Sequence, residues 1–257
     1  MVAKIIQESL GGNEMISVRN LSVCFGAVRA LDDITIQFPC NGVVCLQGEN
    51  GSGKSTLLDV LAGFYHPNSG EVLVDGSKQS ISARNLLRLM ARLHQATVLP
   101  LDLGIREYLS IVRDPSAGRW ILTSDRRTEP KAESLQISQA VVDLLSAGGV
   151  DAFNSIRLCE LSWGQQRLVA LSAVVLARKR MLLLDEPFAG LASDARNAAT
   201  TLISIEARSR LVVVADHDLS AMRRIGDVFI TLQAGRVSAI RSKEQLGTDM
   251  LSEGVDG

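Results

Sequence analysis

The sequence predicts an α/β fold in which an antiparallel β portion accompanies a parallel half of alternating strands and helices. Apolar runs of strand length, alternating or continuous, stand at residues 16–25, 34–38, 43–47 and 71–76. From residue 181 onward, strand, helix, strand and helix follow one another, as in doubly wound sheets whose ligands gather at the carboxyl ends of the strands. A glycine-rich segment, GENGSGKST at residues 48–56, directly follows the run at 43–47. These observations predict a core built around that segment.

The other elements are assigned from the spacing of their apolar residues. Helical spacing predicts helices over residues 82–90, 105–112, 135–146, 163–177, 193–208 and 219–225. The parallel half has strand-like runs at 181–187 and 211–218, and a closing hairpin is expected from 229–232 with 235–240. Residues 113–133 are rich in Arg, Asp, Ser and Pro, so a solvated loop or insertion is predicted there.

The composition narrows the classes of protein to which the chain can belong. Its 257 residues suffice for one large domain, or for a core with a sizeable insertion. The 27 Lys and Arg residues nearly balance the 28 Asp and Glu residues, so the long-range field of nucleic-acid-binding proteins is missing and no nucleic-acid partner is expected. The cysteines lack C-x-x-C or histidine spacing for a metal and are expected as reduced thiols in the core, at positions 24, 40, 45 and 159.

No segment of the sequence approaches the roughly 18 uninterrupted apolar residues of a membrane-spanning helix. The longest apolar run, residues 168–177, is interrupted by Ser172. Residues 1–14 lack the apolar core of a signal peptide. We therefore expect a cytoplasmic chain, and if it works at a membrane, another subunit supplies the span.

The segment at residues 48–56 has the form G-x4-G-K-[ST], which is typical of loops that bind nucleotide phosphates. Gly48, Gly51 and Gly53 would let backbone N–H groups approach the anion without a Cβ in the way. Lys54 would reach the β- and γ-phosphates, Ser55 would ligate Mg²⁺, and the following helix would direct its positive end at the phosphates. The alternative is a glycine-rich turn with a surface lysine. The remaining members of the predicted loop are Glu49, Asn50, Ser52 and Thr56.

A second polar cluster stands at the ends of two predicted parallel strands. The run at 181–187 contains Asp185 and Glu186, and because neighbouring side chains on a strand point in opposite directions, the two carboxylates cannot do the same job. Asp185 suits Mg²⁺, and Glu186 suits the orientation or deprotonation of an attacking water. His217 follows the next strand on the same rim, where it would contact the γ-phosphate or steer that water. The alternatives are a polar strand end and a structural histidine, which is the role expected for His66 and His94.

The segment LSWGQQ at residues 161–166 introduces the helix predicted from residue 163. Ser162 is expected as its N-cap, so that the start of the helix offers a hydroxyl, N–H groups and a positive dipole end to an anion. A chain with one phosphate loop does not need a second anion site for its own nucleotide. We therefore expect the site at Ser162 to serve the nucleotide of another subunit.

Together these motifs resemble those of the ATP-binding cassette (ABC) ATPases over residues 15–240. GENGSGKST resembles the Walker A motif, LSWGQQ the signature motif, and MLLLDEP at residues 181–187 the Walker B motif. Residues 189–192 stand at the D-loop, Gln95 at the glutamine of the Q-loop and His217 at the switch histidine. Phe25 is placed like the aromatic residue that stacks on adenine, and its alternative is a core aromatic at a strand end.

The resemblance implies a P-loop nucleotide-binding core with the antiparallel β portion and an inserted helical subdomain over about residues 90–159, flanked by tails at 1–14 and 241–257. ATP and Mg²⁺ are the implied cofactors. Glu186, His217 and Gln95 would be catalytic, and Ser55, Gln95 and Asp185 would hold the Mg²⁺. The active unit would be a head-to-tail dimer in which the signature residues of one subunit contact the ATP of the other, namely Ser162, Trp163, Gly164 and Gln165.

Within the family, the segments LAGFYHPNSGEV, LSWGQQRL and DEPFAGL look most like ATPases of branched-chain amino-acid or urea uptake systems. This likeness implies an ATP-hydrolysing subunit on the inner face of the cell membrane. Its implied partners are membrane-spanning permease subunits, a second ATPase subunit and, in an importer, a substrate-binding protein. Two residues depart from the family pattern, because Trp163 replaces the first glycine of the signature and Ala192 the Asp or Asn of the D-loop. The alternatives are an exporter ATPase or a degenerate partner in an asymmetric dimer.

Overall fold

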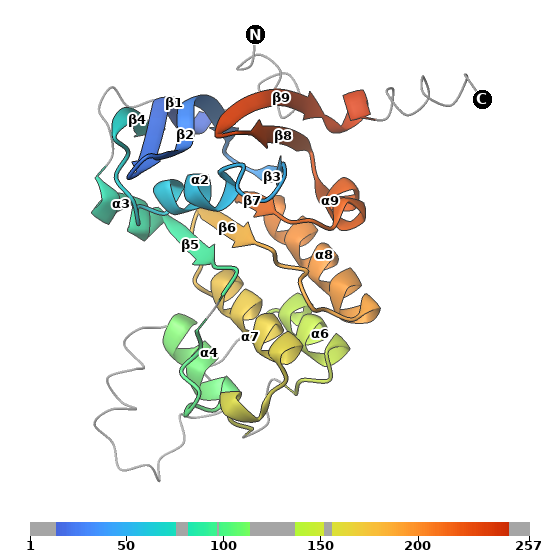
Figure 1. Ribbon diagram of the computed structural model, residues 1–257. Helices are drawn as coiled ribbons and strands as arrows, with labels where there is room; N and C mark the ends of the chain where they lie inside the picture. The colour runs from blue at the N-terminus through green and yellow to red at the C-terminus, as the bar shows by residue number, and fades with distance from the viewer. Residues whose placement is uncertain (1–13, 76–81, 97, 114–136, 152–155, 247–257) are drawn as a thin grey trace, which may run out of the picture.

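The computed structural model describes residues 14–75, 82–96, 98–113, 137–151 and 156–246, which form two β-sheets and the helices that pack on them (Figure 1). The smaller sheet has the order β2 (Val28–Pro39), β1 (Glu14–Phe25), β4 (Ser69–Val74), and both of its strand pairs are antiparallel. Ile16 lies opposite Phe38 on one side and opposite Val74 on the other. The predicted antiparallel β portion is confirmed.

The larger sheet brings the ends of several strands to one rim. Its order is β5 (Met90–Leu93), β6 (Met181–Asp185), β7 (Leu211–Ala215), β3 (Gly42–Gln47), β8 (Val228–Gln233), β9 (Arg236–Ser242). The first five strands are parallel, and β9 closes the sheet as an antiparallel hairpin with β8. The parallel half and the hairpin are thus confirmed. Because parallel strands end at the same edge, the phosphate loop, Asp185 and His217 follow neighbouring strands on one rim.

Strand β5 is an element that the sequence analysis missed. The helix expected over residues 82–90 ends earlier, as α3 (Ala83–Leu89), and Met90 already begins the strand. β5 is only four residues long and has Arg92 at its third position, so it shows no apolar run. It still pairs with β6 along its whole length, from Met90 opposite Met181 to Leu93 opposite Leu184.

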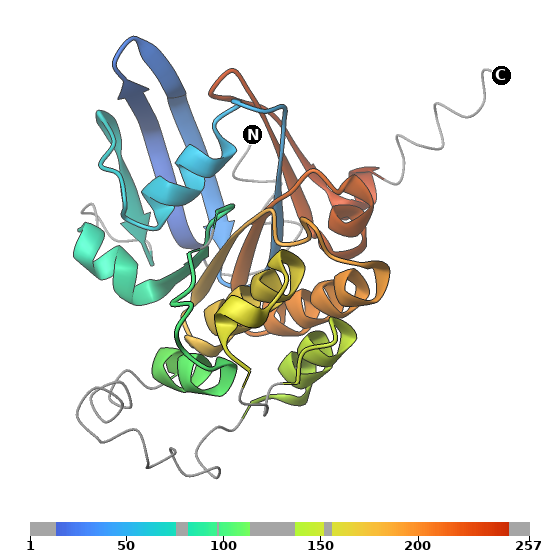
Figure 2. The same cartoon turned by 60° about the horizontal axis from the view of Figure 1, so that its bottom comes forward.

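The remaining helices lie close to their predicted ranges. Those that follow strands of the larger sheet are α2 (Lys54–Leu61), α8 (Ser193–Ala207) and α9 (Leu219–Ile225). In the helical part, α4 and α6 flank α7 below the sheet (Figures 1 and 2). The elements there are α4 (Ile105–Arg113), α6 (Gln139–Ala147), the 3₁₀ turn η2 (Leu158–Glu160) and α7 (Trp163–Leu176).

Two sequence expectations concern segments only partly covered by the structure. The start of the helix expected at residue 135 lies outside the described residues, and α6 begins at Gln139 after its N-cap Ser138. Nearly all of the loop predicted at 113–133 lies outside the described residues as well. Within the described ranges, no helix combines the length and the apolar character that crossing a membrane requires.

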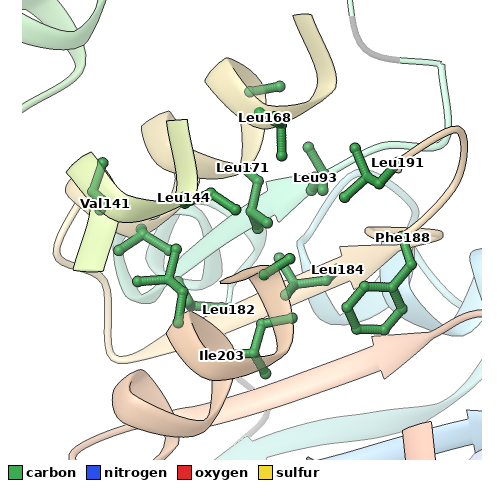
Figure 3. Close-up of a cluster of buried hydrophobic side chains, with 14 of the residues drawn as sticks. Leu93, Val141, Leu144, Leu168, Leu171, Leu182, Leu184, Phe188, Leu191 and Ile203 are labelled. Atoms are coloured by element: carbon green, nitrogen blue, oxygen red, sulfur yellow. The ribbon is translucent and has the colours of Figure 1, made fainter. Parts of the chain in front are cut away.

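The larger sheet is buried on both faces, which decides where its polar residues emerge. Leu182 and Leu184 of β6 join a cluster with α6, α7 and α8 (Figure 3), whereas Leu183 joins a cluster with α2 and the smaller sheet. A strand covered on both sides needs a continuous apolar run, and MLLL is such a run. The first polar residues after it, Asp185 and Glu186, therefore come at the rim.

The cysteines correct the expectation of four core thiols. Cys45 on β3 is buried, and burial raises the pKa of its thiol. Cys24 and Cys40 are half-buried, and Cys159, in the turn η2, is exposed. The core prediction is thus right for Cys45 and wrong for Cys159. No disulfide joins cysteines in the described part of the chain.

Candidate functional site

The phosphate loop connects β3 to α2 and turns through three glycines with positive φ. The angles are 141° at Gly48, 79° at Gly51 and 105° at Gly53, a region that favours glycine. At two of these positions a side chain would also collide with backbone. A Cβ would lie 2.2 Å from the Leu232 carbonyl oxygen at Gly48, and 2.6 Å from the Ala30 carbonyl oxygen at Gly53. The backbone at Gly48, Gly51 and Gly53 thus favours glycine, and the approach of the loop N–H groups to an anion stays a prediction.

Lys54 lies inside the loop and not on the surface. Its ammonium donates hydrogen bonds to the carbonyl oxygens of Gly48, at 2.7 Å, and Glu49, at 2.9 Å, and only 8% of the residue is exposed. Burial lowers the pKa of Lys54, against the opposing effect of the carboxylates of Asp185 and Glu186. The alternative of a glycine-rich turn with a surface lysine is therefore wrong.

The N-cap of α2 is Gly53, which has no side chain that could accept a hydrogen bond from the N–H groups of the first turn. The first N–H groups of a helix have no partners within the helix, so they can bind an anion. The other predicted loop residues differ in exposure: Ser52 is buried, Thr56 is half-buried, and Glu49, Asn50, Gly51 and Ser55 are exposed.

Asp185 and Glu186 have different surroundings, as strand alternation predicts. The Asp185 carboxylate is buried and accepts a hydrogen bond from Nη2 of Arg92 at 2.9 Å. Glu186 has a φ of 49°, and its amide donates to the carbonyl oxygen of Ala215 at 2.6 Å. Oε1 of Glu186 lies 3.3 Å from Nε2 of His217. The expected meeting of Glu186 and His217 on one rim is confirmed.

Arg92 is a residue of this site that the sequence analysis missed. Its side chain is 4% exposed, and its Nε donates to Oδ1 of Asp59 on α2 at 3.0 Å, so that it bridges Asp59 and Asp185. A guanidinium stays protonated when buried and needs such partners. The sequence feature that could have identified Arg92 is its charge in the middle of an otherwise apolar segment, Met90–Leu93. His94, expected to be structural, also lies here, with Nδ1 3.8 Å from Asp59, and burial lowers its pKa.

The oxygen donors at the rim fit Mg²⁺ in company with phosphate and water oxygens. In the parts of the chain that the structure describes, no three His, Cys, Asp or Glu side chains gather into a metal cage. Asp185 supplies one carboxylate at the end of β6, and Ser55 and Gln95 are exposed donors at the start of α2 and after β5. Mg²⁺ commonly binds through one or two carboxylates together with substrate phosphates and retained waters. This donor set therefore suits Mg²⁺ bound with a nucleotide.

Phe25 and Gln95 both lie at the surface. Phe25 is 45% exposed, and its ring meets that of Tyr65 edge to face with 5.3 Å between the centroids. The alternative of a core aromatic is wrong, and the exposed ring can stack on a ligand. Gln95 has an exposed side chain, and its carbonyl oxygen accepts a hydrogen bond from Nη1 of Arg167 at 3.1 Å.

Ser162 is the N-cap of α7, as predicted. Its Oγ accepts a hydrogen bond from the Gln165 amide at 3.3 Å, and the Gln165 side chain accepts one from the Ser162 amide at 3.0 Å, which closes a capping box. Trp163 is 58% exposed, and its ring covers Gly190, where a Cβ would lie 2.1 Å from Cζ3 of the indole. A Cβ on Gly164 would lie 3.0 Å from the carbonyl oxygen of Gly190. The substituted signature residue therefore packs on segment 189–192 of its own chain.

Asp216 and Arg167 are two further residues that the sequence analysis missed. The Asp216 carboxylate accepts hydrogen bonds from the amides of Phe188, at 3.0 Å, and Asp218, at 2.8 Å, and burial raises its pKa. It thus ties the end of β7 to the segment after Glu186. Arg167 is buried on α7. The sequence feature that could have identified each residue is a charge directly beside an apolar run.

Comparison with known proteins agrees with this geometry. The model of the ABC transporter family matches residues 31–189, which is more than half of the chain. The arabinose import ATP-binding protein AraG 1 of Burkholderia ambifaria is 31% identical over 245 residues, covering 92% of this chain and 46% of that protein. The xylose/arabinose import ATP-binding protein XylG of Sulfolobus acidocaldarius is 25% identical, covering 94% of this chain and 93% of that protein.

A solved structure shares the fold. The dimeric structure of a post-hydrolysis state of an ATP-binding cassette, bound to ADP and Pi, matches with a TM-score of 0.69 and 23% identity over 89% of this chain and 99% of that chain. The chain spans less than half the length of the arabinose relative, and the names of the two relatives do not support the expected likeness to branched-chain amino-acid or urea systems. The match to the family model and the shared fold lead to one conclusion: the chain belongs to the ABC transporter family and has the fold of an ATP-binding cassette.

Proposed function

We propose that this chain is the ATP-binding and ATP-hydrolysing subunit of a membrane transporter. The observation that carries the proposal is the convergence of Lys54, Asp185, Glu186 and His217 on one rim of the larger sheet. The ammonium of Lys54 lies within the field of both carboxylates, and Glu186 lies 3.3 Å from His217. One ammonium, two carboxylates and one imidazole around a glycine-rich anion site suit the transfer of a phosphoryl group to water.

Each of these residues has a distinct proposed task. The loop N–H groups and Lys54 bind the β- and γ-phosphates of ATP. Asp185, with Ser55 and Gln95, holds Mg²⁺, which when bound neutralises charge on the phosphate oxygens. The Glu186 carboxylate takes a proton from the attacking water, and His217 orients that carboxylate.

The backbone of Glu186 supports its task as the base. A φ of 49° costs a residue with a side chain on the order of 1–2 kcal/mol, and such strain is found where the surroundings impose it, often at active sites. Here the Glu186 amide is fixed to Ala215 and the Phe188 amide to Asp216, both at the end of β7. The turn therefore keeps the Glu186 carboxylate beside His217.

A second subunit completes the proposed unit. Ser162 is exposed, and its capping bond uses an acceptor lone pair of Oγ, so the hydroxyl proton can still be donated to an anion in front of α7. The resemblance to ABC ATPases, and the dimeric state of the solved cassette, support the proposal that this turn binds the ATP of a partner. The partner is a second copy of this chain or a paralogue.

The names of the relatives support a coupling to sugar import. AraG 1 and XylG are import ATP-binding proteins for arabinose and for xylose or arabinose. We extend this to the present chain and propose the uptake of a pentose or a similar small polar solute, with permease subunits and a substrate-binding protein. The chain would then work at the cytoplasmic face of the membrane. An exporter ATPase remains the alternative, whereas an amino-acid or urea substrate has no support from these relatives.

The catalytic proposal is tested by Glu186→Gln in the complex assembled with its permease. We expect ATP binding to persist while hydrolysis falls by roughly 10²- to 10⁴-fold, because the amide cannot accept the proton of the attacking water. In the isolated Glu186→Gln chain, ATP should trap a dimer, visible by light scattering. The matched control is Glu244→Gln, an exposed glutamate near the end of the described chain, which should leave hydrolysis unchanged. Hydrolysis at the wild-type rate by Glu186→Gln would show that Glu186 is not the base.

The substrate proposal needs a separate experiment in whole cells. A strain that lacks the chain should lose uptake of labelled arabinose, xylose or ribose, and the wild-type chain should restore it. Glu186→Gln should fail to restore uptake, whereas Glu244→Gln should succeed. Loss of leucine or urea uptake with unchanged sugar uptake would overturn the sugar proposal and leave the ATPase proposal intact.

A further inference from the structure

The guanidinium of Arg167 lies at the meeting point of three parts of the cassette. Arg167 is on α7, five residues after Ser162, and only 3% of it is exposed. Nη1 donates hydrogen bonds to the carbonyl oxygens of His94, at 2.5 Å, and Gln95, at 3.1 Å. Nη2 donates to the carbonyl oxygen of Glu186 at 3.0 Å and to that of Asp185. One side chain thus holds two pairs of carbonyl groups.

The two pairs of carbonyl groups belong to neighbouring strands of the larger sheet. His94 and Gln95 follow β5, and Asp185 and Glu186 stand at the end of β6, where Leu93 pairs with Leu184. The planar fork of a guanidinium, with its donors fixed relative to one another, matches two such pairs at once. Lysine has the same charge but cannot reproduce this geometry.

These bonds are difficult to break one at a time. Burial lowers the pKa of Arg167, and the carboxylates of Asp185, Glu186 and Asp216 counter that effect. Because a guanidinium does not lose its proton in proteins, it cannot become neutral when a partner leaves. Removing a carbonyl from its reach would leave a buried charge less well compensated, which is strongly unfavourable. The four carbonyl groups should therefore stay with the guanidinium as α7 shifts.

We propose that Arg167 is a positioning residue that joins the signature helix α7 to the backbone of Gln95 and of Glu186, so that the three move as one body. A displacement of α7, produced at Ser162 by a partner's nucleotide or at α4 and α6 by a permease, then reaches the segment of Gln95 and the base together. The functional consequence rests on the proposed ATP hydrolysis. The coupling itself is measurable without nucleotide.

Arg210 provides a matched control at the other end of the same helix. It is also buried, with Nη2 2.9 Å from the Val175 carbonyl oxygen at the end of α7 and Nη1 3.0 Å from that of Lys179, before β6. Nη2 also lies 2.5 Å from the carboxylate of Glu206. Arg210 therefore also joins α7 to β6 through buried hydrogen bonds to carbonyl oxygens, but at the edge of the larger sheet opposite to the rim.

The test compares Arg167→Lys and Arg167→Gln with Arg210→Lys and Arg210→Gln. In the nucleotide-free full chain, hydrogen exchange should become faster at residues 93–95 and at 185–188 together in the Arg167 variants, and at neither segment in the Arg210 variants. In the assembled complex, Arg167→Lys should lower kcat by about 10²-fold, the effect of a displacement near 1 Å, with KM for ATP nearly unchanged. A structural role alone would not produce this split between kcat and KM.

Two outcomes would overturn the coupling. One is faster exchange at only one of the two segments, and the other is an equal kcat loss in the Arg167 and Arg210 variants. If the Arg167 variants do not fold, native-state exchange of the wild-type chain in increasing urea decides, because amides in the two segments should share one opening free energy. Different opening energies would refute the proposal. If the two segments exchange together but the chain does not hydrolyse ATP, the proposed coupling stands and the proposed ATPase function is rejected.

Discussion

Within the strand-end cluster, which consists of Lys54, Asp185, Glu186 and His217, the two carboxylate residues are held by contacts with distant parts of the chain, whereas the capping bonds of the signature turn, residues 162–165, join residues close in the sequence. Asp185 takes its hydrogen bond from Arg92, 93 residues away in the sequence. The capping box of the signature turn consists of two hydrogen bonds between residues three apart, and both Ser162 and Trp163 are exposed.

This difference shows how the two halves of the proposed ATP site are built. The strand-end cluster is arranged before any ligand arrives, so its charges and donors need little reorganisation around phosphate. The signature turn has a defined shape but needs a phosphate from outside its own chain. Substitution of Lys54 in the cluster should therefore weaken nucleotide binding by the single chain. Substitutions in the turn should affect hydrolysis by the dimer.

The largest effect is expected for Lys54→Ala. In the proposed site the ammonium would make charge-assisted contacts to two phosphates, at roughly 1.5–3 kcal/mol each. It also fixes the Gly48 and Glu49 carbonyl groups of the loop. We expect the Kd for ATP of the isolated chain to rise by about 10²- to 10⁴-fold. Isothermal titration calorimetry measures this directly.

Lys179→Ala is the control for Lys54→Ala. The Lys179 ammonium also donates to a backbone carbonyl oxygen, that of Arg88 at 3.2 Å, but the residue precedes β6 at the opposite edge of the sheet. Its replacement should leave the Kd for ATP unchanged. An unaltered Kd for Lys54→Ala as well would disprove the assignment of the phosphate loop.

A smaller effect, confined to the dimer, is expected for Ser162→Ala. Loss of one hydroxyl donor to the developing charge on phosphate should lower hydrolysis by about 10²-fold in the assembled complex. The isolated chain should bind ATP as before, because its own ATP does not contact this turn. Loss of the N-cap acceptor should cost about 1 kcal/mol of unfolding free energy.

Two further variants separate the capping role of Ser162 from its role as a donor. Ser162→Asp keeps an acceptor for the Gln165 amide but places a negative charge before the phosphate, so stability should be retained and hydrolysis lost. Ser138→Ala changes the N-cap serine of α6, whose side chain makes no capping bond in the described structure, and should change neither quantity. Full hydrolysis by Ser162→Asp would contradict the donor role.

Much of the strand-end cluster could be predicted from the sequence because its positions are forced by local physics. The loop glycines have positive φ, and Asp185 and Glu186 are the first polar residues after a run buried on both faces. The capping box of Ser162 is a contact within four residues and could be predicted for the same reason. Such constraints depend on the nearby sequence and not on which strand lies alongside.

The contacts that support the cluster could not be predicted in this way. Arg92, Arg167 and Asp216 are charged residues that resemble surface residues until the pairing of β5, β6 and β7 is known. Strand β5 itself escaped notice because Arg92 interrupts it. The packing of Trp163 on Gly190 joins two segments far apart in the sequence. The expected subfamily depended on short segments alone, whereas the longer alignments match proteins that are named as sugar import ATP-binding proteins.

The smallest effects are expected where the signature turn packs on another segment of its own chain, at Trp163 and Gly190. Gly190 has a φ of 68°, so Gly190→Ala adds strain of about 1–2 kcal/mol, and its Cβ would also displace the indole. In a Trp163→Gly background only the strain remains. A double-mutant cycle by urea unfolding should therefore give a coupling energy near 1 kcal/mol, within the range for residues in contact. Equal costs of Gly190→Ala in both backgrounds would show that the ring does not pack there.

The same variants decide what the tryptophan does to the signature turn. Trp163 starts α7 with an ordinary negative φ and packs on its own chain, so it leaves the Ser162 hydroxyl and the Gly164 N–H to act as donors. Trp163→Gly should thus change hydrolysis in the assembled complex far less than Ser162→Ala does. A strong activation by Trp163→Gly, together with little effect of Ser162→Ala, would instead identify a degenerate signature, and the working site of the dimer would then depend on the partner's signature.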